Sequence, residues 1–468
     1  MQRLGNSLLT ESPNTGKGLK EIFNMSNLKG EIYLFLRRNF TFRNWERFYQ
    51  EIESSLSFNL EKEYLKRIIW HAFNNVPYYR DIFEEFGLVK SGEVFLGRFE
   101  ELPVLTKSML KENFTNLISK DFKNRKWFKN SSGGSTGIPQ TFIQDKEFRE
   151  WNIATQTFYF RKLLKTDYAK VKKVILWGSE RDIFGKKKTL KAKISNWLSQ
   201  NIFLNTFRVS EKDWLRYIEL INKKKPHFIK GYAGSLYEIA KLAKQKGLKV
   251  WQPRLIYSSA ETLRPFMRET IEEVFGCKVY DFYGSREVGS TAGECQRGKL
   301  HIFNFNNLVE VVDEKNKSVR PGEMGRVLIT TLHNFSMPLI RYEVEDTAIL
   351  GGQCDCGIET PTLERITGRI TDHFKNKKGE LIHGEYFTHL FYFREWVKAF
   401  QVVQEELDKI KIFFSGMEAN QKEVKEIEEK IRLVMGQDCR IGWEKVKEIP
   451  PTPQGKYLFT RSLIYQTR

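Results

Sequence analysis

Seven consecutive residues of this chain read Ser131-Ser132-Gly133-Gly134-Ser135-Thr136-Gly137, three glycines among four small hydroxyl side chains. Glycine lets a backbone approach a polyphosphate closely, and small hydroxyl groups donate hydrogen bonds to it without bulk. The spacing differs from the G-x-x-x-x-G-K-S/T of a Walker loop. Taken alone, such a run is as typical of a flexible turn as of a phosphate site. The other segments of the chain therefore have to distinguish these two interpretations.

Four further segments follow this glycine run in a set order. They are Ser258-Ser259-Ala260-Glu261, Asp281-Phe282-Tyr283-Gly284-Ser285-Arg286-Glu287, Arg341-Tyr342-Glu343-Val344-Glu345-Asp346 and Pro451-Thr452-Pro453-Gln454-Gly455-Lys456-Tyr457. In this order the five segments resemble the adenylate-forming superfamily. Within it the chain is most similar to the phenylacetate-CoA ligase-like family, including its branch found in capsular polysaccharide gene clusters. The likeness spans most of the chain, because Val76 to Arg80, Leu102 to Lys107 and Arg365 to Arg369 also look like that family.

The middle of the chain, from about residue 170 to 350, alternates short apolar runs with amphipathic stretches. This alternation predicts strands that alternate with helices along the chain, and hence an α/β fold. We expect strands at 174–177, 255–257, 279–280 and 325–331, and helices at 236–242 and 266–275. The resemblance implies that this α/β body is a large N-terminal adenylation domain of several subdomains.

The pattern of apolar and charged residues changes after Gly368-Arg369. Residues 397–404 and 409–414 predict a hairpin, and residues 421–434 predict a charged helix. A small α+β unit of about 100 residues fits this segment. We therefore expect a domain at 1–368 for ATP and the acyl substrate, and a domain at 369–468 that carries Lys456. The resemblance implies that the small domain is mobile.

The composition limits the classes of partner. Lys and Arg outnumber Asp and Glu by 77 to 58, a net charge of +19, which suits a nucleotide, a nucleic acid or an acidic membrane surface. The lysine runs 186–188 and 223–225 are short and no nucleic-acid motif accompanies them, so we expect no specific nucleic-acid partner. The sequence has no run of roughly 18–20 apolar residues and no secretory signal, which favours the cytoplasm. The oligomeric state stays open, a homodimer included.

The resemblance also implies roles at the nucleotide. Tyr283 would stack on adenine, Glu287 would help to hold Mg²⁺, and Asp346 would accept hydrogen bonds from the ribose hydroxyls. An aromatic face suits a purine, and a carboxylate suits a hard cation shared with phosphate oxygens. The other residues that it places around ATP or AMP are the glycine run Ser131 to Gly137 and Ser259, Ala260, Glu261, Gly284, Ser285, Arg286 and Arg369.

Lys456 is the residue that we expect to act in the chemical step. A mobile ammonium can bridge the incoming carboxylate and the α-phosphate as charge builds up there. The family hinge follows the Gly-Arg pair and commonly holds Asp or Lys, whereas this chain has Thr371 there, followed by Asp372. Arg286 stands where many relatives carry a small hydroxyl residue, so it is a candidate to contact phosphate or substrate.

Four side chains of the types that commonly bind Zn²⁺ occur in two pairs. These pairs are Cys295 with His301 and Cys354 with Cys356. Three thiols and one imidazole make a complete tetrahedral set, which is typical of a structural zinc site. The alternative is four unrelated side chains, since the second pair is C-x-C rather than C-x-x-C. Some phenylacetate-CoA ligase-like proteins resemble this arrangement, and we expect zinc.

The expected reaction begins with attack of a carboxylate on the α-phosphate of Mg-ATP, which releases pyrophosphate and leaves an acyl-adenylate. The acyl group then passes to the thiol of coenzyme A, or alternatively to an amine or hydroxyl of a sugar or amino acid. A further alternative is a non-catalytic nucleotide-binding or scaffold protein. The resemblance places the acyl pocket between the glycine run and the segments 230–234 and 257–260. The nearby aromatics Trp177 and Tyr232 could line this pocket or could equally belong to the core.

Overall fold

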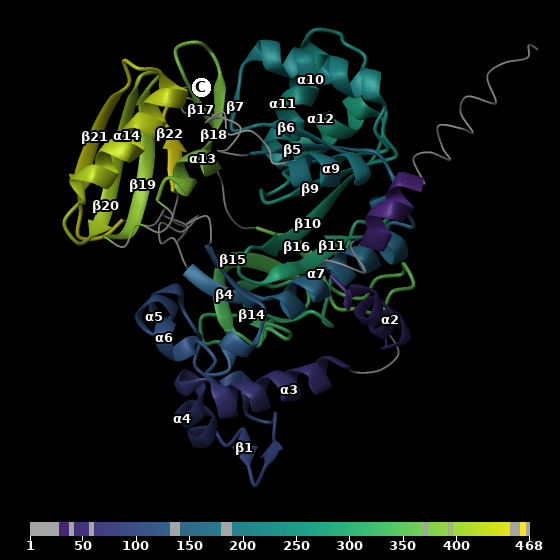
Figure 1. Cartoon of the computed structure of the whole chain (residues 1–468), viewed down its shortest axis with the longest axis vertical. Helices are drawn as coiled ribbons and strands as arrows, with labels where there is room; N and C mark the ends of the chain where they lie inside the picture. Colours follow the sequence, from purple (N-terminus) through teal and green to yellow (C-terminus); the bar gives the residue numbers. More distant parts are fainter. Residues whose placement is uncertain are drawn as a thin grey trace, which may run out of the picture.

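The computed structural model describes residues 28–36, 42–55, 60–131, 141–178, 190–367, 373–391, 394, 396–449 and 459–464. It shows a large body built on an 11-stranded sheet, with a small C-terminal unit at its side (Figure 1). No helix within these ranges is both long and apolar enough to cross a bilayer.

The large sheet has a parallel half and an antiparallel half. Its strand order is β13-β14-β15-β16-β12-β11-β10-β9-β8-β5-β6. The parallel strands are β5 (Lys173–Trp177), β6 (Asn201–Asn205), β8 (Phe228–Gly231), β9 (Leu255–Ser259) and β10 (Val279–Ser285). The antiparallel strands are β11 (Gly289–Glu294), β12 (Leu300–Ile302), β13 (Asn307–Val312), β14 (Met324–Thr331), β15 (Tyr342–Leu350) and β16 (Thr362–Ile366). The strands expected from the sequence correspond to β5, β9, β10 and β14.

Helices cover both faces of the parallel half. One face packs against α10 (Glu211–Lys224), α11 (Ala233–Gln245) and α12 (Pro265–Phe275) around a core that includes Ile218, Ile239 and Ile271. The other face packs against α7 (Lys146–Phe158) and the π-helix Tyr159–Leu163, where Tyr159 contacts Phe282 edge to face at 5.1 Å. The expected helices at 236–242 and 266–275 are thus confirmed.

The N-terminal part forms helices around the lower part of the body in Figure 1. They are α2 (Trp45–Ser55), α3 (Leu60–Asn75), α4 (Pro77–Glu85), α5 (Lys107–Glu112) and α6 (Phe114–Leu117). Pro77 ends the pattern of α3 and opens α4, since proline lacks the N–H that a first helical residue leaves unpaired. Thr106 begins α5, because its hydroxyl accepts a hydrogen bond from the Met109 N–H at 3.2 Å.

The small C-terminal unit is a four-stranded sheet with a helix packed on it. Its strand order is β21-β20-β19-β22. Its elements are α13 (Gly384–His389), β19 (Val397–Glu406), β20 (Lys409–Gly416), α14 (Gln421–Met435), β21 (Arg440–Lys445) and β22 (Thr460–Ser462). The hairpin and the charged helix predicted for this segment are therefore confirmed. The boundary proposed at residue 368 falls on residues outside the described ranges.

The small unit contacts the body through strand pairing and through a common apolar core. The strands β17 (His373–Lys375) and β18 (Leu381–His383) pair with β7 (Arg208–Val209) of the body. Phe207 and Tyr232 of the body lie in the same apolar cluster as Phe387 and Phe400 of the small unit. The Lys111 ammonium also donates to the Val397 carbonyl at 3.2 Å.

Candidate active site

The glycine run begins where a hairpin ends. Ser131 closes β3 (Trp127–Ser131), and it pairs with Thr141, which opens β4 (Thr141–Asp145). The remaining residues of the run, 132–137, lie outside the described part of the chain, so their contact with phosphate stays a prediction. The Arg286 guanidinium lies 3.5 Å from the Ser131 carbonyl oxygen. The base of the run is therefore next to the Tyr283–Glu287 segment.

That segment turns sharply at the end of β10. The pairing of β10 with β11 shifts between Tyr283 and Gly284, and a Cβ at Gly284 would lie 2.4 Å from the Gly289 carbonyl oxygen. Only glycine fits such a close backbone approach. The turn carries Glu287 into the interior, where this residue is 4% exposed. No described residue forms a hydrogen bond or an ion pair with the Glu287 carboxylate, which leaves its oxygens available to a cation.

Gln144 supports this turn from β4. Its side-chain amide donates to the carbonyl of Arg286 at 2.7 Å and to that of Glu287 at 3.2 Å. Its own amide oxygen accepts from Asn130 at 3.1 Å. No local sequence pattern predicts a role for Gln144, because it lies 142 positions from Arg286.

Asp346 lies on β15 and meets Tyr283 directly. The Tyr283 hydroxyl donates to Asp346 Oδ2 at 2.9 Å, so the residues expected at adenine and at ribose are neighbours. Beside them, the buried Lys107 ammonium forms an ion pair with Glu345 at 2.8 Å. Lys107 lies in the segment 102–107 that resembles the family, but nothing in the sequence assigned it to this strand.

The segment after β9 is fixed by its own contacts. The Ser259 hydroxyl donates to the Phe282 carbonyl at 3.0 Å, which ties the end of β9 to the middle of β10. Ala260 takes a left-handed conformation with φ of 71°. The Glu261 carboxylate accepts from the Gly234 N–H at 2.7 Å at the start of α11. These three residues shape the site, and their contact with nucleotide stays a prediction.

Arg369, Thr371, Asp372 and Lys456 lie outside the described residues. Their expected roles therefore stay predictions. The chain is described again from residue 459, where β22 pairs in parallel with β19.

A cationic and aromatic group lies near the carboxyl ends of the parallel strands, the edge at which open α/β sheets bind ligands. The Lys230 ammonium lies 4.9 Å from the ring centroid of Trp177 and 5.0 Å from that of Tyr257. Burial lowers the pKa of Lys230 to about 8. Trp177 in turn stacks on Tyr232 at 4.2 Å. This group corresponds to the segments at which the acyl pocket was expected.

The four predicted zinc ligands come together. Their ligand atoms all lie within 4.8 Å of one another, with Cys295 Sγ 3.7 Å from Cys354 Sγ and Cys356 Sγ 3.2 Å from His301 Nε2. The His301 Nδ1 atom lies 2.9 Å from the Thr360 hydroxyl, which orients Nε2 toward the thiols. Sulfur atoms at this spacing suit a tetrahedral ion with bonds of about 2.3 Å. The donor set thus fits Zn²⁺, and the alternative of four unrelated side chains fits the geometry less well.

The cluster connects two parts of the sheet. Cys295 follows β11 and His301 lies on β12, whereas Cys354 and Cys356 lie in the loop between β15 and β16. Asp346 is on β15, so the cluster braces the strand that carries it. The remaining cysteines, Cys277 and Cys439, are not part of the cluster. Burial raises the pKa of their thiols, to about 12 and about 11.

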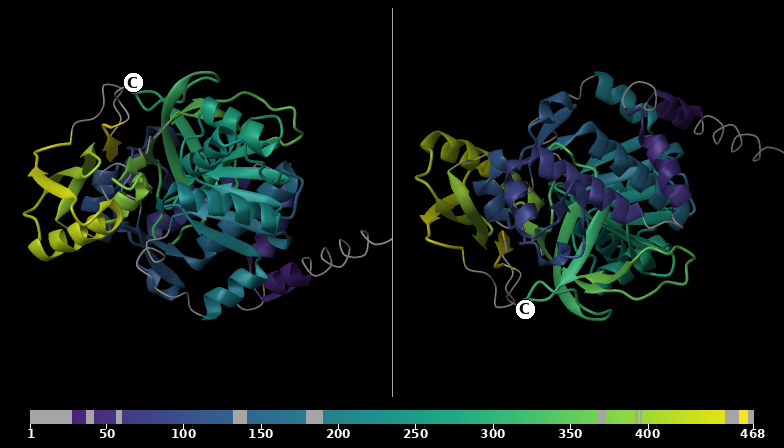
Figure 2. Two further views of the ribbon diagram at one scale, coloured as in Figure 1. Left: turned by 90° about the horizontal axis from the view of Figure 1, so that it is seen from above. Right: turned by 90° about the horizontal axis from the view of Figure 1, so that it is seen from below.

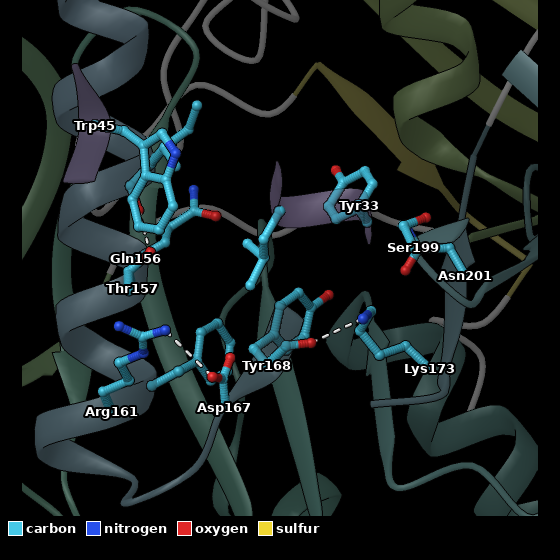
Figure 3. A pocket seen from close by; sticks show the side chains of 13 residues that line it. Tyr33, Trp45, Gln156, Thr157, Arg161, Asp167, Tyr168, Lys173, Ser199 and Asn201 are labelled. Atoms are coloured by element: carbon cyan, nitrogen blue, oxygen red, sulfur yellow. Dashed lines mark hydrogen bonds and ion pairs between the residues drawn. The ribbon is translucent and has the colours of Figure 1, made fainter. Parts of the chain in front are cut away.

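A separate cavity of about 100 Å³ lies at the other end of the parallel strands, between α7 and the start of β5 (Figure 3). Lys173 is buried in its wall and donates to the carbonyls of Tyr168 and Val171, both at 2.8 Å. Trp45 and Asn201 also line it, and among the described residues their Nε1 and Oδ1 atoms have no hydrogen-bond partner. Such a polar cavity has room for ordered water. It is distinct from the residues expected at the nucleotide.

Curated proteins are similar to this chain along most of its length. Protein CapK of Staphylococcus aureus is 24% identical over 441 residues, which cover 93% of this chain and 95% of that protein. The phenylacetate-coenzyme A ligase of Thermus thermophilus is 24% identical over 327 residues, which cover 67% and 70%. The chain is thus similar over most of its length to proteins of the adenylate-forming, phenylacetate-CoA ligase-like kind.

The fold agrees with that family. A crystal structure of 2-hydroxyisobutyryl-CoA ligase in complex with 2-HIB-AMP and CoA is similar with a TM-score of 0.54 and 19% identity, over 86% of this chain and 89% of the other. The profile of the CapK C-terminal domain matches residues 374–462, which hold the small unit. The expected architecture of an adenylate-forming ligase, a large N-terminal domain with a small C-terminal domain, is thereby confirmed.

Proposed function

We propose that this chain is an AMP-forming ligase that activates a carboxylic acid with ATP and transfers the acyl group to coenzyme A. One observation carries this proposal. Tyr283, hydrogen-bonded to Asp346, and the buried Glu287, whose carboxylate pairs with no described residue, lie together beside the base of the glycine run. Several relatives are named phenylacetate-coenzyme A ligase, which supports the same class of reaction.

In the first half-reaction, a carboxylate oxygen of the acid bonds to the α-phosphorus of ATP, and the bond to the leaving pyrophosphate breaks. Tyr283 would hold the adenine by its ring face, and Asp346 would hold the ribose hydroxyls. Glu287 would bind Mg²⁺, which when present neutralises phosphate charge. Lys456 would stabilise the negative charge that builds up between the carboxylate and the α-phosphate.

In the second half-reaction, the sulfur of coenzyme A attacks the acyl carbon, and AMP leaves. We propose that the acid lies at the carboxyl ends of β5, β8 and β9, beside Lys230 and Trp177. The aromatic rings there offer apolar contact area, and the Lys230 ammonium lies over the ring faces of Trp177 and Tyr257. Such a cation suits an acid that bears a second polar or anionic group.

A different acceptor is the second candidate, and one observation favours it. The Thermus ligase aligns with 67% of this chain, whereas CapK aligns with 93%, and the profile that matches the small unit is that of CapK. The second half-reaction of this chain could therefore use an amine or hydroxyl of a sugar or amino acid. The first half-reaction is the same in both cases.

The test is pyrophosphate release from ATP over a panel of carboxylic acids, each with and without coenzyme A. We expect at least one acid to stimulate release in the wild type, and Glu287→Gln to abolish the stimulation. Glu314→Gln, at an exposed position, is the matched control. Acyl-CoA formation would select the first acceptor, and consumption of acyl-AMP only with amines or sugars the second. Nucleotide binding with no stimulation by any acid would instead indicate a non-catalytic protein.

A further inference from the structure

A groove of about 480 Å³ lies at the amino end of β10, whereas Tyr283 stands near the carboxyl end of the same strand. Its walls come from the end of the π-helix and the turn after it, the start of β10, the turn between β11 and β12, and the loop between β15 and β16. Figure 2 shows the small C-terminal unit, in yellow, beside the body, and no described residue of that unit lines the groove. The groove therefore belongs to the body and is distinct from the candidate active site.

The lining of this groove is strongly cationic. Among its ten lining residues are four cations and one carboxylate, so the lining has a net charge of +3. These charged residues are Lys162, Lys165, Lys278, Arg297 and Asp355. A cleft lined mainly by one sign of charge attracts ligands of the opposite sign. The groove therefore suits an anion.

Most of these cations are available to a ligand. The ammonium groups of Lys165 and Lys278 form no hydrogen bond or ion pair with any residue that the structure describes, and both side chains are exposed. The Arg297 guanidinium lies 3.8 Å from the single carboxylate of the groove, which is too far for a hydrogen bond. Only Lys162 is closely held, by Glu53 at 2.5 Å. Three cations can thus meet an incoming anion.

The groove also has an apolar part. Tyr280 and Ile358 are half-buried in its wall, and Leu163 is buried there. An aromatic ring such as that of Tyr280 offers contact area to a planar group. Cys356 lines the groove as well, but its sulfur lies 3.2 Å from His301 Nε2 and belongs to the predicted zinc cluster. The lining thus suits an anion that also carries an apolar or planar portion.

We propose that this groove binds a small molecule that carries two phosphate groups and a planar ring, the chemistry of a nucleoside diphosphate. The phosphates contact Lys165, Lys278 and Arg297, and the ring packs on Tyr280. A diphosphate ester carries roughly three negative charges at neutral pH, which complements the charge of the lining. This inference does not depend on the ligase reaction.

The size of the groove favours such a ligand over a nucleic acid. A volume of about 480 Å³ lies within the range of roughly 300–1,000 Å³ that is typical of small-molecule pockets. A nucleic acid would instead need a basic stripe that extends along the surface.

The experiment is isothermal titration calorimetry of the full chain with UDP at low salt. We expect binding that weakens as salt is added, because salt screens exposed charges. The triple variant Lys165→Gln, Lys278→Gln and Arg297→Gln should bind UDP at least tenfold more weakly. The control variant Lys123→Gln, Lys223→Gln and Arg320→Gln removes the same charge from exposed positions outside the groove, and it should bind as the wild type does.

Several results would overturn the proposal. One is the absence of UDP binding by the wild type. Another is full binding by the triple variant of the groove, and loss of binding in Asp346→Ala would then assign UDP to the candidate nucleotide site. A third is a single-stranded RNA oligonucleotide that binds more tightly than UDP and displaces it, which would make the groove part of a nucleic-acid surface.

Discussion

The Tyr283 hydroxyl donates a hydrogen bond to Asp346 Oδ2 at 2.9 Å and so joins β10 to β15 across 63 positions of the chain. Each residue limits the freedom of the other, so the contacts expected at adenine and at ribose are fixed relative to one another before a nucleotide arrives. Lys107 adds a second restraint at the neighbouring Glu345. Such preorganisation lowers the entropic cost of binding.

The variant Tyr283→Phe keeps the ring and removes this hydrogen bond. We expect the KM for ATP to rise about two- to tenfold, since a hydrogen bond of this kind contributes about 0.5–1.5 kcal/mol. Asp346→Ala should raise it further, because both ribose contacts are lost. The double variant should show less than the sum of the two effects. Tyr280→Phe, on the same strand, is the control, and an equal rise there would contradict the assignment.

Lys456→Ala separates the two half-reactions. We expect loss of acid-dependent pyrophosphate release, because the charge at the α-phosphate is no longer stabilised. Transfer from a supplied acyl-adenylate to the acceptor should continue at near the wild-type rate. Lys447→Ala, at an exposed lysine nearby in the sequence, should leave both steps unchanged. A variant that loses both steps equally would show that Lys456 does not act in adenylation alone.

Many helices and strands can be predicted from local sequence patterns, but one strand and one long-range strand pairing cannot. The apolar runs of β5, β9 and β14 and the period of α14 predict their elements directly. Strand β11 reads Gly-Ser-Thr-Ala-Gly-Glu, with no alternation to mark it, and it forms because β10 and β12 flank it. The pairing of β7 with β18 joins segments too far apart for any local signal.

Some residues of the candidate site were likewise predicted from the sequence, and others were not. Tyr283, Glu287 and Asp346 were predicted from resemblance, and the structure brings the first and last of these into contact. Gln144 and Lys107 were missed because their partners lie 142 and 238 positions away. Hydrogen bonds between residues so far apart in the chain form only when the sheet is assembled. They therefore produce no local pattern in the sequence.

The Cys295 cluster predicts bound zinc. We expect one Zn²⁺ per chain by elemental analysis, and its loss in Cys354→Ser or Cys356→Ser, with a lower thermal midpoint because a structural zinc contributes directly to folding. Cys277→Ser is the matched control, since that thiol is outside the cluster. Wild-type protein with no zinc after purification without chelators would end this assignment.

Lys230→Met tests the acyl pocket. Methionine is unbranched and only one atom shorter than lysine, so it can still contact the Trp177 and Tyr257 rings, and it removes the charge. We expect the KM for an acid with a second anionic group to rise at least tenfold, while the KM for ATP changes little. Lys241→Met, on the surface of α11, is the control. A rise in the KM for ATP instead would place Lys230 at the nucleotide.

Asp281 predicts how stability depends on pH. Burial, and to a smaller extent the charge of Glu294, raise the pKa of this carboxyl to about 7, although Arg268 opposes the shift. The folded protein therefore holds a proton that the unfolded chain has lost above its ordinary pKa of 3.8. This contribution to stability is fully present below about 3.8 and is lost as the pH rises toward 7.

The variant Asp281→Asn cannot titrate and keeps the oxygen that accepts from the Phe282 N–H at 2.9 Å. We expect its free energy of unfolding to lack this decline, so that the wild type loses up to about 1.4 kcal/mol per pH unit relative to the variant between pH 4 and 7. Urea unfolding at pH 5, 6, 7 and 8 measures the difference. Asp81→Asn, at an exposed carboxylate, should run parallel to the wild type. Parallel curves for Asp281→Asn would mean that Asp281 is already ionised in the folded protein, with Arg268 outweighing burial.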